Sequence, residues 1–171
     1  MILIGFSGKK RTGKNTVASL IKSITNQTFE EFSLAQDLKL ELAQMLKIKV
    51  SDIEISKELY RPLLQALGCF RREFNGQDYW VNKCFRRIYH SNADVCVITD
   101  IRFENEVKAT QASGGLVVRV SRDTGLVDTH ESETALDGYR GFDHVILNTG
   151  SLGHLLEDVK DFSKKTGIKL K

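Results

Sequence analysis

The chain has 171 residues, of which 41% are apolar and 27% charged, and its formal net charge is +3 at pH 7. This length fits a single domain over residues 1–171 and is enough to bury a core without disulfide or metal staples. The basic residues form separate local clusters instead of one stripe, so we expect no nucleic-acid partner. So small a net charge gives no argument for a membrane surface either.

Cysteine usage and the apolar runs indicate the compartment. Cys69, Cys84 and Cys96 are widely spaced, odd in number and without zinc or redox spacing, which indicates reduced thiols. No apolar run reaches membrane-spanning length, and no basic segment precedes the opening Met-Ile-Leu-Ile to make it a signal peptide. We therefore expect a cytoplasmic protein that binds no membrane.

A phosphate-binding loop is the most specific local signal. Residues 8–16 read Gly-Lys-Lys-Arg-Thr-Gly-Lys-Asn-Thr, directly after an apolar run and before an amphipathic helix. Glycines at this spacing let backbone N–H groups converge on a polyphosphate, and the lysine adds a positive charge. An ordinary strand-to-helix turn with surface lysines is the alternative, but it does not require this spacing. We expect a polyphosphate to be bound by Gly8, Arg11, Thr12, Gly13, Lys14, Asn15 and Thr16.

Metal handling departs from the usual loop pattern. Asn15 follows the lysine where a Ser or Thr hydroxyl ordinarily reaches magnesium, and Thr16 comes next. An amide oxygen is a poorer magnesium ligand than that hydroxyl. We expect Mg²⁺ to be held largely through water, which this ion tolerates well.

Strand-like and helix-like runs alternate along the chain. We expect strands at residues 2–6, 28–32, 95–99, 116–120 and 144–147, and helices at 14–24, 36–46, 57–70, 78–89, 104–112 and 151–162. This alternation predicts an α/β, three-layer fold with a five-stranded parallel sheet and helices on both faces. Pro62 indicates a first turn or a kink in its helix. The polar segment 122–141 lacks a period and is expected to form a short lid.

Polar residues after the strands are candidates for chemistry, because ligands bind at the carboxyl ends of parallel strands. Asp100 can face the magnesium of a bound nucleotide, through water, or cap the next helix. Arg102 suits bidentate phosphate recognition, with a surface arginine as the alternative. Periodicity alone favours a capping role for Ser33 and solvated charges for Asp37 and Lys39.

The helix at residues 57–70 and the residues after it add further candidates. Arg61, Gln65, Arg71 and Arg72 lie on or just after this helix, but two adjacent arginines cannot share one helix face. Trp80 follows and is more typical of a core than of a platform for base stacking.

These segments together resemble the viral and bacterial deoxynucleoside monophosphate kinases. The motifs are KKRTGKNTVA at residues 9–18, LQALG at 64–68, YWV at 79–81, TDIRFENE at 99–106, HESETALD at 130–137 and GFDHVI at 141–146. They span nearly the whole chain. The animal-type phosphomevalonate kinases share a diluted form of the same pattern, including the Ser-Glu-x-x-Leu-Asp element.

The resemblance implies a P-loop kinase that transfers the ATP γ-phosphoryl group to a deoxynucleoside 5′-monophosphate. It implies catalytic roles for Lys14, Arg102 and Arg122, and an acceptor site that includes Ser33, Asp37, Lys39, Arg61, Gln65, Arg71, Arg72, Trp80 and Glu133. A phosphomevalonate-type acceptor and a non-catalytic ATP-binding module are the alternatives. A homodimer and, for a phage protein, the host cytoplasm fit the resemblance.

Overall fold

The computed structural model describes residues 1–125 and 129–171, in two compact units. We call Met1–Phe32 with Ser91–Lys171 the sheet unit, and Ser33–His90 the helical unit. The prediction of one domain over the whole chain stays a prediction. Of the predicted lid, residues 126–128 lie outside the described part. None of the described helices has the length and hydropathy needed to cross a membrane.

Five parallel strands form the sheet, in the order β2-β3-β1-β4-β5. They are β1 (Ile2–Ser7), β2 (Phe29–Phe32), β3 (Val95–Ile101), β4 (Leu116–Ser121) and β5 (His144–Leu147). The sheet unit also holds α1 (Lys14–Ile24), α6 (Glu104–Ala112), α7 (Glu131–Thr134) and α8 (Leu152–Lys165). The predicted five-stranded parallel sheet is confirmed, and the phosphate loop leaves it at the carboxyl end of the central strand β1.

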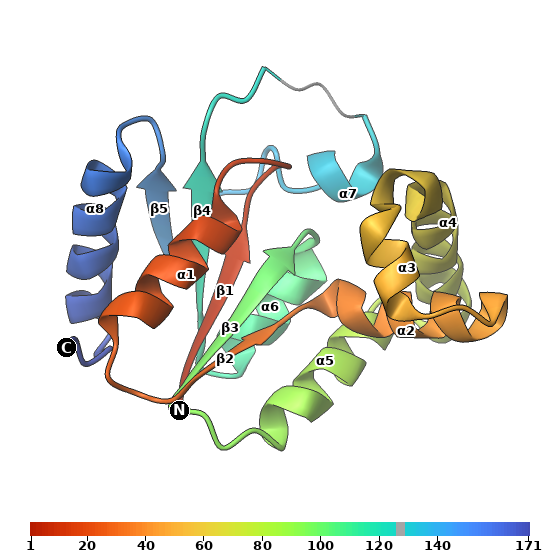
Figure 1. Cartoon of the computed structure of the whole chain (residues 1–171), viewed down its shortest axis with the longest axis horizontal. Helices are drawn as coiled ribbons and strands as arrows, with labels where there is room; N and C mark the ends of the chain where they lie inside the picture. Colours follow the sequence, from red (N-terminus) through yellow and green to blue (C-terminus); the bar gives the residue numbers. More distant parts are fainter. Residues whose placement is uncertain (126–128) are drawn as a thin grey trace. The chain divides into compact units, whose positions relative to one another are not determined.

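Successive residues of each strand point to opposite faces of the sheet, so their side chains form one packed layer on each face. Alternate strand residues such as Ile4, Val97 and Val118 pack with the buried faces of α1 and α8. On the opposite face, α6 comes so close that a Cβ at Gly5 or Gly115 would meet Thr110. Figure 1 shows α1 in front of the sheet and α6 behind it. Helices therefore cover both faces, as the continuous apolar strands predict.

The helical unit packs four helices around one apolar cluster. They are α2 (Leu34–Leu46), α3 (Val50–Ile55), α4 (Lys57–Asn75) and α5 (Tyr79–Tyr89). Leu42, Ile53, Leu67 and Trp80 are buried members of the cluster. Pro62 lies inside α4, beyond its first turn, so the helix continues past the proline.

Two short helices were not predicted. α3 begins after Lys49, whose N–H donates to the Asp52 carboxylate over 3.0 Å. α7 lies in the segment predicted as a lid and is capped by His130, whose Nδ1 accepts from Ser132 N–H over 3.2 Å. Both helices are too short to leave a clear hydrophobic period, and their caps depend on local hydrogen bonds.

Glu41 ties three elements of the helical unit together. Its carboxylate accepts from Arg71 Nε over 2.5 Å, from the Tyr79 hydroxyl over 3.1 Å and from Lys83 Nζ over 3.4 Å. Burial alone would raise the pKa of Glu41, but the hydrogen bonds from Arg71 and Tyr79 and the charges of Arg71 and Lys83 outweigh it, so the pKa lies below its ordinary 4.5. The ionised form is therefore the one that the fold stabilises.

We expect Glu41→Gln to lower the free energy of unfolding by about 1–3 kcal/mol at neutral pH, because charge-assisted hydrogen bonds are lost. A depressed carboxyl pKa adds stability above the unfolded pKa of about 4.5, and this stability is lost as the pH falls through the folded pKa. The difference in the free energy of unfolding between the variant and the wild type should therefore become smaller below about pH 4.5. Urea unfolding followed by circular dichroism at several pH values measures it. Glu73→Gln, an exposed acid of α4, is the control, and an equal loss in both variants would contradict the assignment.

Candidate active site

The phosphate loop, residues 8–13, is a tight backbone turn between β1 and α1. Gly8 has φ +154° and Gly13 has φ +99°, in the region that favours glycine. A Cβ at Gly8 would collide with the Val120 carbonyl oxygen, and one at Gly13 with the Asn148 side-chain amide. Both predicted glycines thus occupy positions where no larger residue fits, as a close phosphate cradle requires.

Lys14 is buried beneath this loop. Its Nζ donates to the carbonyl oxygens of Gly8 over 2.6 Å and of Lys9 over 2.9 Å. Burial and the nearby Arg102 charge lower the pKa of Lys14 from its ordinary 10.5 to about 8, against the opposing effects of Glu133 and Asp100. An ammonium held in this way is poorly solvated, so an anion entering the loop would bind it strongly.

Asn148 fixes the loop from the end of β5. Its buried side chain donates from Nδ2 to the Thr12 carbonyl oxygen over 2.9 Å. Thr12 Oγ1 in turn donates to the Lys9 carbonyl oxygen over 3.0 Å. Sequence reasoning missed Asn148, although a polar residue directly after the last apolar strand was an available signal.

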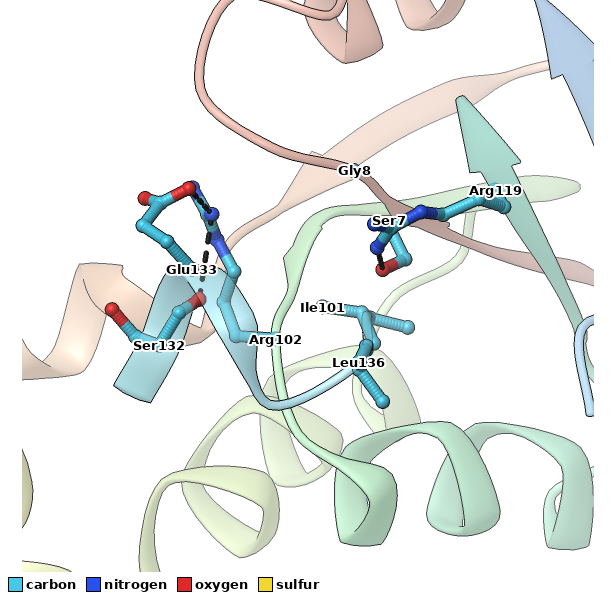
Figure 2. Close-up of a pocket in the computed structure, with 8 residues that line it drawn as sticks. All are labelled: Ser7, Gly8, Ile101, Arg102, Arg119, Ser132, Glu133 and Leu136. Carbon is cyan, nitrogen blue, oxygen red and sulfur yellow. Dashed lines mark hydrogen bonds and ion pairs between the residues drawn. The ribbon is translucent and has the colours of Figure 1, made fainter. Parts of the chain in front are cut away.

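Arg102 and Glu133 meet beside the loop. Arg102 Nη1 lies 2.5 Å from Glu133 Oε2 and donates to the Ser132 carbonyl oxygen over 3.5 Å. The same Glu133 oxygen accepts from the backbone N–H of Lys10 over 3.1 Å. Figure 2 shows Arg102 reaching Glu133 and Ser132 from the end of β3. The structure therefore brings three predicted parts of the site together, namely the loop, Arg102 and Glu133.

Arg119, which the sequence reasoning did not select, is a further cation at this edge. From β4, its Nη1 donates to Ser7 Oγ over 3.1 Å, and its Nη2 lies 3.7 Å from Asp137 Oδ1. Burial lowers the pKa of Arg119, Asp137 opposes this effect, and the Arg102 charge adds to it. The signal for Arg119 was a lone charge within the apolar run Leu-Val-Val-Arg-Val at residues 116–120.

A small cavity marks the meeting point of these side chains. It measures about 10 Å³ and is lined by residues that include Ser7, Gly8, Arg102, Arg119, Glu133 and Leu136 (Figure 2). This volume is about enough for one water molecule. With α7 against the loop, the space between Arg102 and Arg119 is therefore closed to a larger ligand.

Asp100 lies at the carboxyl end of β3, close enough to oppose the fall in the Lys14 pKa. It does not cap α6. The cap residue is Phe103, and Glu106 accepts from the N–H groups of Arg102 and Phe103 over 2.6 and 3.0 Å. Among residues 1–125 and 129–171 no cluster of three or more His, Cys, Asp or Glu side chains is arranged to hold a metal.

The remaining candidates of the sheet unit are solvent-exposed. Arg11 is exposed on the loop, in a left-handed conformation with φ +65°. Asn15 and Thr16 are exposed in the first turn of α1, and Arg122 is exposed directly after β4. Their assignment to donor binding and catalysis stays a prediction.

Charged candidates of the helical unit are mostly engaged in ion pairs within it. Arg87 binds Asp37 through Nε and Nη2 over 3.2 and 3.0 Å, and its Nη2 also donates to the Ser33 carbonyl oxygen over 2.7 Å. Lys39 pairs with Glu54 over 2.5 Å. Such pairs position the side chains, and a role of Ser33, Asp37 and Lys39 in substrate binding stays a prediction.

On α4 the arginines take different directions. Arg61 pairs with Glu58 on the same helix over 3.0 Å, whereas Arg71 reaches Glu41 on α2. Arg72 Nη2 donates to Cys69 Sγ over 3.4 Å. Gln65 is half-buried on the same helix. Trp80, on α5, is 5% exposed and donates to the Gly68 carbonyl oxygen over 3.3 Å, so it lies in the core.

Comparisons with known proteins agree with the motifs. A family model described as phosphomevalonate kinase matches residues 6–114. The chain is 29% identical, over 89% of its length and 91% of the relative's, to an Acanthamoeba polyphaga mimivirus protein described provisionally as a deoxynucleotide monophosphate kinase. It is 36% identical over 61% of its length to the deoxynucleotide monophosphate kinase of Enterobacteria phage T4, of which it spans 45%. Both families that the motifs resemble are therefore matched, which confirms the resemblance.

The fold has solved counterparts. The structure of shikimate kinase from Acinetobacter baumannii superposes with a TM-score of 0.53 at 13% identity, covering 99% of this chain and 96% of that one. At this identity the likeness concerns the fold alone. It confirms the predicted three-layer architecture.

We expect ATP binding above about pH 8 to take up a fraction of a proton, because the free Lys14 has a pKa of about 8 and bound phosphates raise it. Calorimetry in two buffers of different ionisation enthalpy measures the uptake. Lys14→Met should abolish it, whereas the exposed control Lys22→Met should retain it. Uptake that persists in Lys14→Met would assign the titrating group elsewhere.

Proposed function

The chain belongs to the phosphomevalonate kinase family, and we propose that it transfers the γ-phosphoryl group of ATP to the phosphate of a deoxynucleoside 5′-monophosphate. The products are ADP and the deoxynucleoside diphosphate. The chain is a P-loop kinase, and the observation that carries the proposal is the convergence of Lys14, Arg102 and Arg119 beside the loop. Phosphoryl transfer depends on such cations more than on covalent chemistry from the protein.

The choice of acceptor is supported by the mimivirus and phage relatives, whose names specify a deoxynucleotide monophosphate. Two alternatives remain. A phosphomevalonate-type acceptor is favoured by the name of the family model. A non-catalytic ATP-binding module is disfavoured by the number of arginines, which exceeds what the donor phosphates need.

The donor side fits ATP. Gly8 and Gly13 allow the tight turn of the loop, and Lys14 is placed to exchange its two carbonyl partners for phosphate oxygens. Arg11, Thr12, Asn15 and Thr16 complete the proposed donor site. Bound magnesium supplies neutralisation of charge on the outer phosphates, and Asp100 would hold it, largely through water.

Transfer requires alignment and stabilisation of the moving group. Arg102 and Arg119 extend toward one space from β3 and β4, the two strands that flank β1, and there they can bind the oxygens of a phosphoryl group. Arg122 follows β4 and is proposed as a lid cation. No general base is needed, because the attacking phosphate oxygen is already an anion. This mechanism uses the chain's cations and leaves His130 in its capping role.

The acceptor site is proposed on the helical unit, and the assignment of Glu133 to acceptor binding stays a prediction from the resemblance. Its proposed residues are Ser33, Asp37, Lys39, Arg61, Gln65, Arg71, Arg72 and Trp80. We propose that one of Arg71 and Arg72 binds the acceptor phosphate; Arg71 pairs with Glu41, and Arg72 donates to Cys69. A homodimer is proposed only by resemblance.

A panel of acceptors tests the function. All common deoxyribonucleoside and ribonucleoside monophosphates and phosphomevalonate are each incubated with MgATP, and ADP release is measured. We expect the highest kcat/KM with a deoxynucleoside monophosphate. Turnover with phosphomevalonate alone would establish the first alternative, and ATP binding without acceptor-stimulated turnover the second.

We expect Arg102→Lys to lower kcat about 100- to 1,000-fold, because lysine cannot reproduce the planar, bidentate donor geometry. Lys14→Ala should lower kcat by at least the same factor, while its melting temperature stays close to that of the wild type. The exposed Arg140 supplies the control Arg140→Lys. Near-normal turnover of either site variant in the acceptor assay would remove that residue from the mechanism.

A further inference from the structure

Glu133 occupies a place suited to a phosphate. Its carboxylate accepts from the loop N–H of Lys10 and pairs with the Arg102 guanidinium, and its side chain is only 5% exposed. A loop amide and an arginine are the two donors that a bound phosphoryl oxygen takes in this kind of site. From α7, the Glu133 carboxylate thus binds the Lys10 N–H and the Arg102 guanidinium, the two donors that a phosphate would use.

The position matches the outermost phosphate of the donor. The amides at the start of α1 lie at the helix end of the loop, where inner phosphates bind, and Lys14 supplies charge for the outer phosphates. Lys10 lies toward the strand end, and Arg102 faces the group that is transferred in the proposed function. The Glu133 carboxylate therefore substitutes for the γ-phosphate and not for the β-phosphate.

Both anions cannot be present together. The cavity beside Glu133 measures about 10 Å³, which leaves no room for a phosphoryl group (Figure 2). Two negative groups sharing Arg102 and the Lys10 amide would also repel each other at short range. A γ-phosphate must therefore displace the carboxylate, which breaks the contact of Glu133 on α7 with the loop.

We propose that Glu133 is a specificity residue for the donor: its carboxylate holds the γ-phosphate position, so that a nucleoside triphosphate displaces it and a diphosphate leaves it in place. The inference rests on the proposed donor site, not on the identity of the acceptor. Binding of a triphosphate then releases α7 from the loop. Asp137, which pairs with Lys9 over 2.8 Å and lies 3.7 Å from Arg119, is a second anchor of the same segment.

Calorimetry with ADP and with a non-hydrolysable ATP analogue, both with magnesium, tests the competition. Glu133→Gln keeps the shape of the side chain but removes the charge, so the analogue should bind about tenfold more tightly and ADP within about twofold of the wild type. Glu131→Gln removes an exposed charge from the same helix and should shift both nucleotides equally. An unchanged ratio of the two affinities, or weaker binding of the analogue, would overturn the proposal.

Hydrogen exchange on the wild-type protein gives a second readout that needs no variant. Amides of α7 should exchange faster with the ATP analogue than with ADP, because only the triphosphate displaces Glu133. Equal protection in both complexes would contradict the displacement. These measurements use no acceptor. If no acceptor in the panel stimulates ADP release but the triphosphate analogue displaces Glu133, only the proposed function is refuted. If an acceptor stimulates ADP release but the analogue and ADP behave alike, only the role of Glu133 is refuted.

Discussion

At the carboxyl edge of the sheet, the Arg102 charge lowers the pKa of both Lys14 and Arg119. Cations this close and this poorly solvated repel one another unless an anion lies between or beside them. In the structure Glu133 and Asp137 provide that negative charge from α7 and the residue run after it. In the proposed function a bound polyanion meets the same requirement, because it replaces the acids with more charge and more acceptor oxygens.

Much of the sheet unit could be predicted from the sequence because its signals are local. The apolar run at residues 95–99 specifies a buried parallel strand, and the spacing of Gly8, Gly13 and Lys14 specifies the loop. α7 and the partners of Arg102 could not be predicted from the sequence, since they depend on contacts between residues far apart in the chain. Arg119 falls between these cases. Its charge within an apolar strand was visible, but its direction toward Ser7 was not.

In the helical unit, sequence reasoning could place arginines on a helix but could not assign their partners. The side chains of the adjacent Arg71 and Arg72 point in different directions, as helix geometry requires. They also have different partners, since Arg71 pairs with Glu41 on another helix. Asp37 is likewise held by Arg87, fifty positions away in the chain. Pairs of this kind are specified by packing of the whole unit, so residue spacing alone does not distinguish a substrate ligand from a structural ion pair.

Asn148 makes the nucleotide cradle a property of the complete sheet and not of its first forty residues. Its amide supports the Thr12 carbonyl across a sequence distance of 136 positions, from beyond the last strand. Grafting the glycine-rich stretch onto another scaffold would transfer the backbone pattern without this support. A protein truncated before β5 would keep every recognisable motif residue of the loop and lose the contact that closes it.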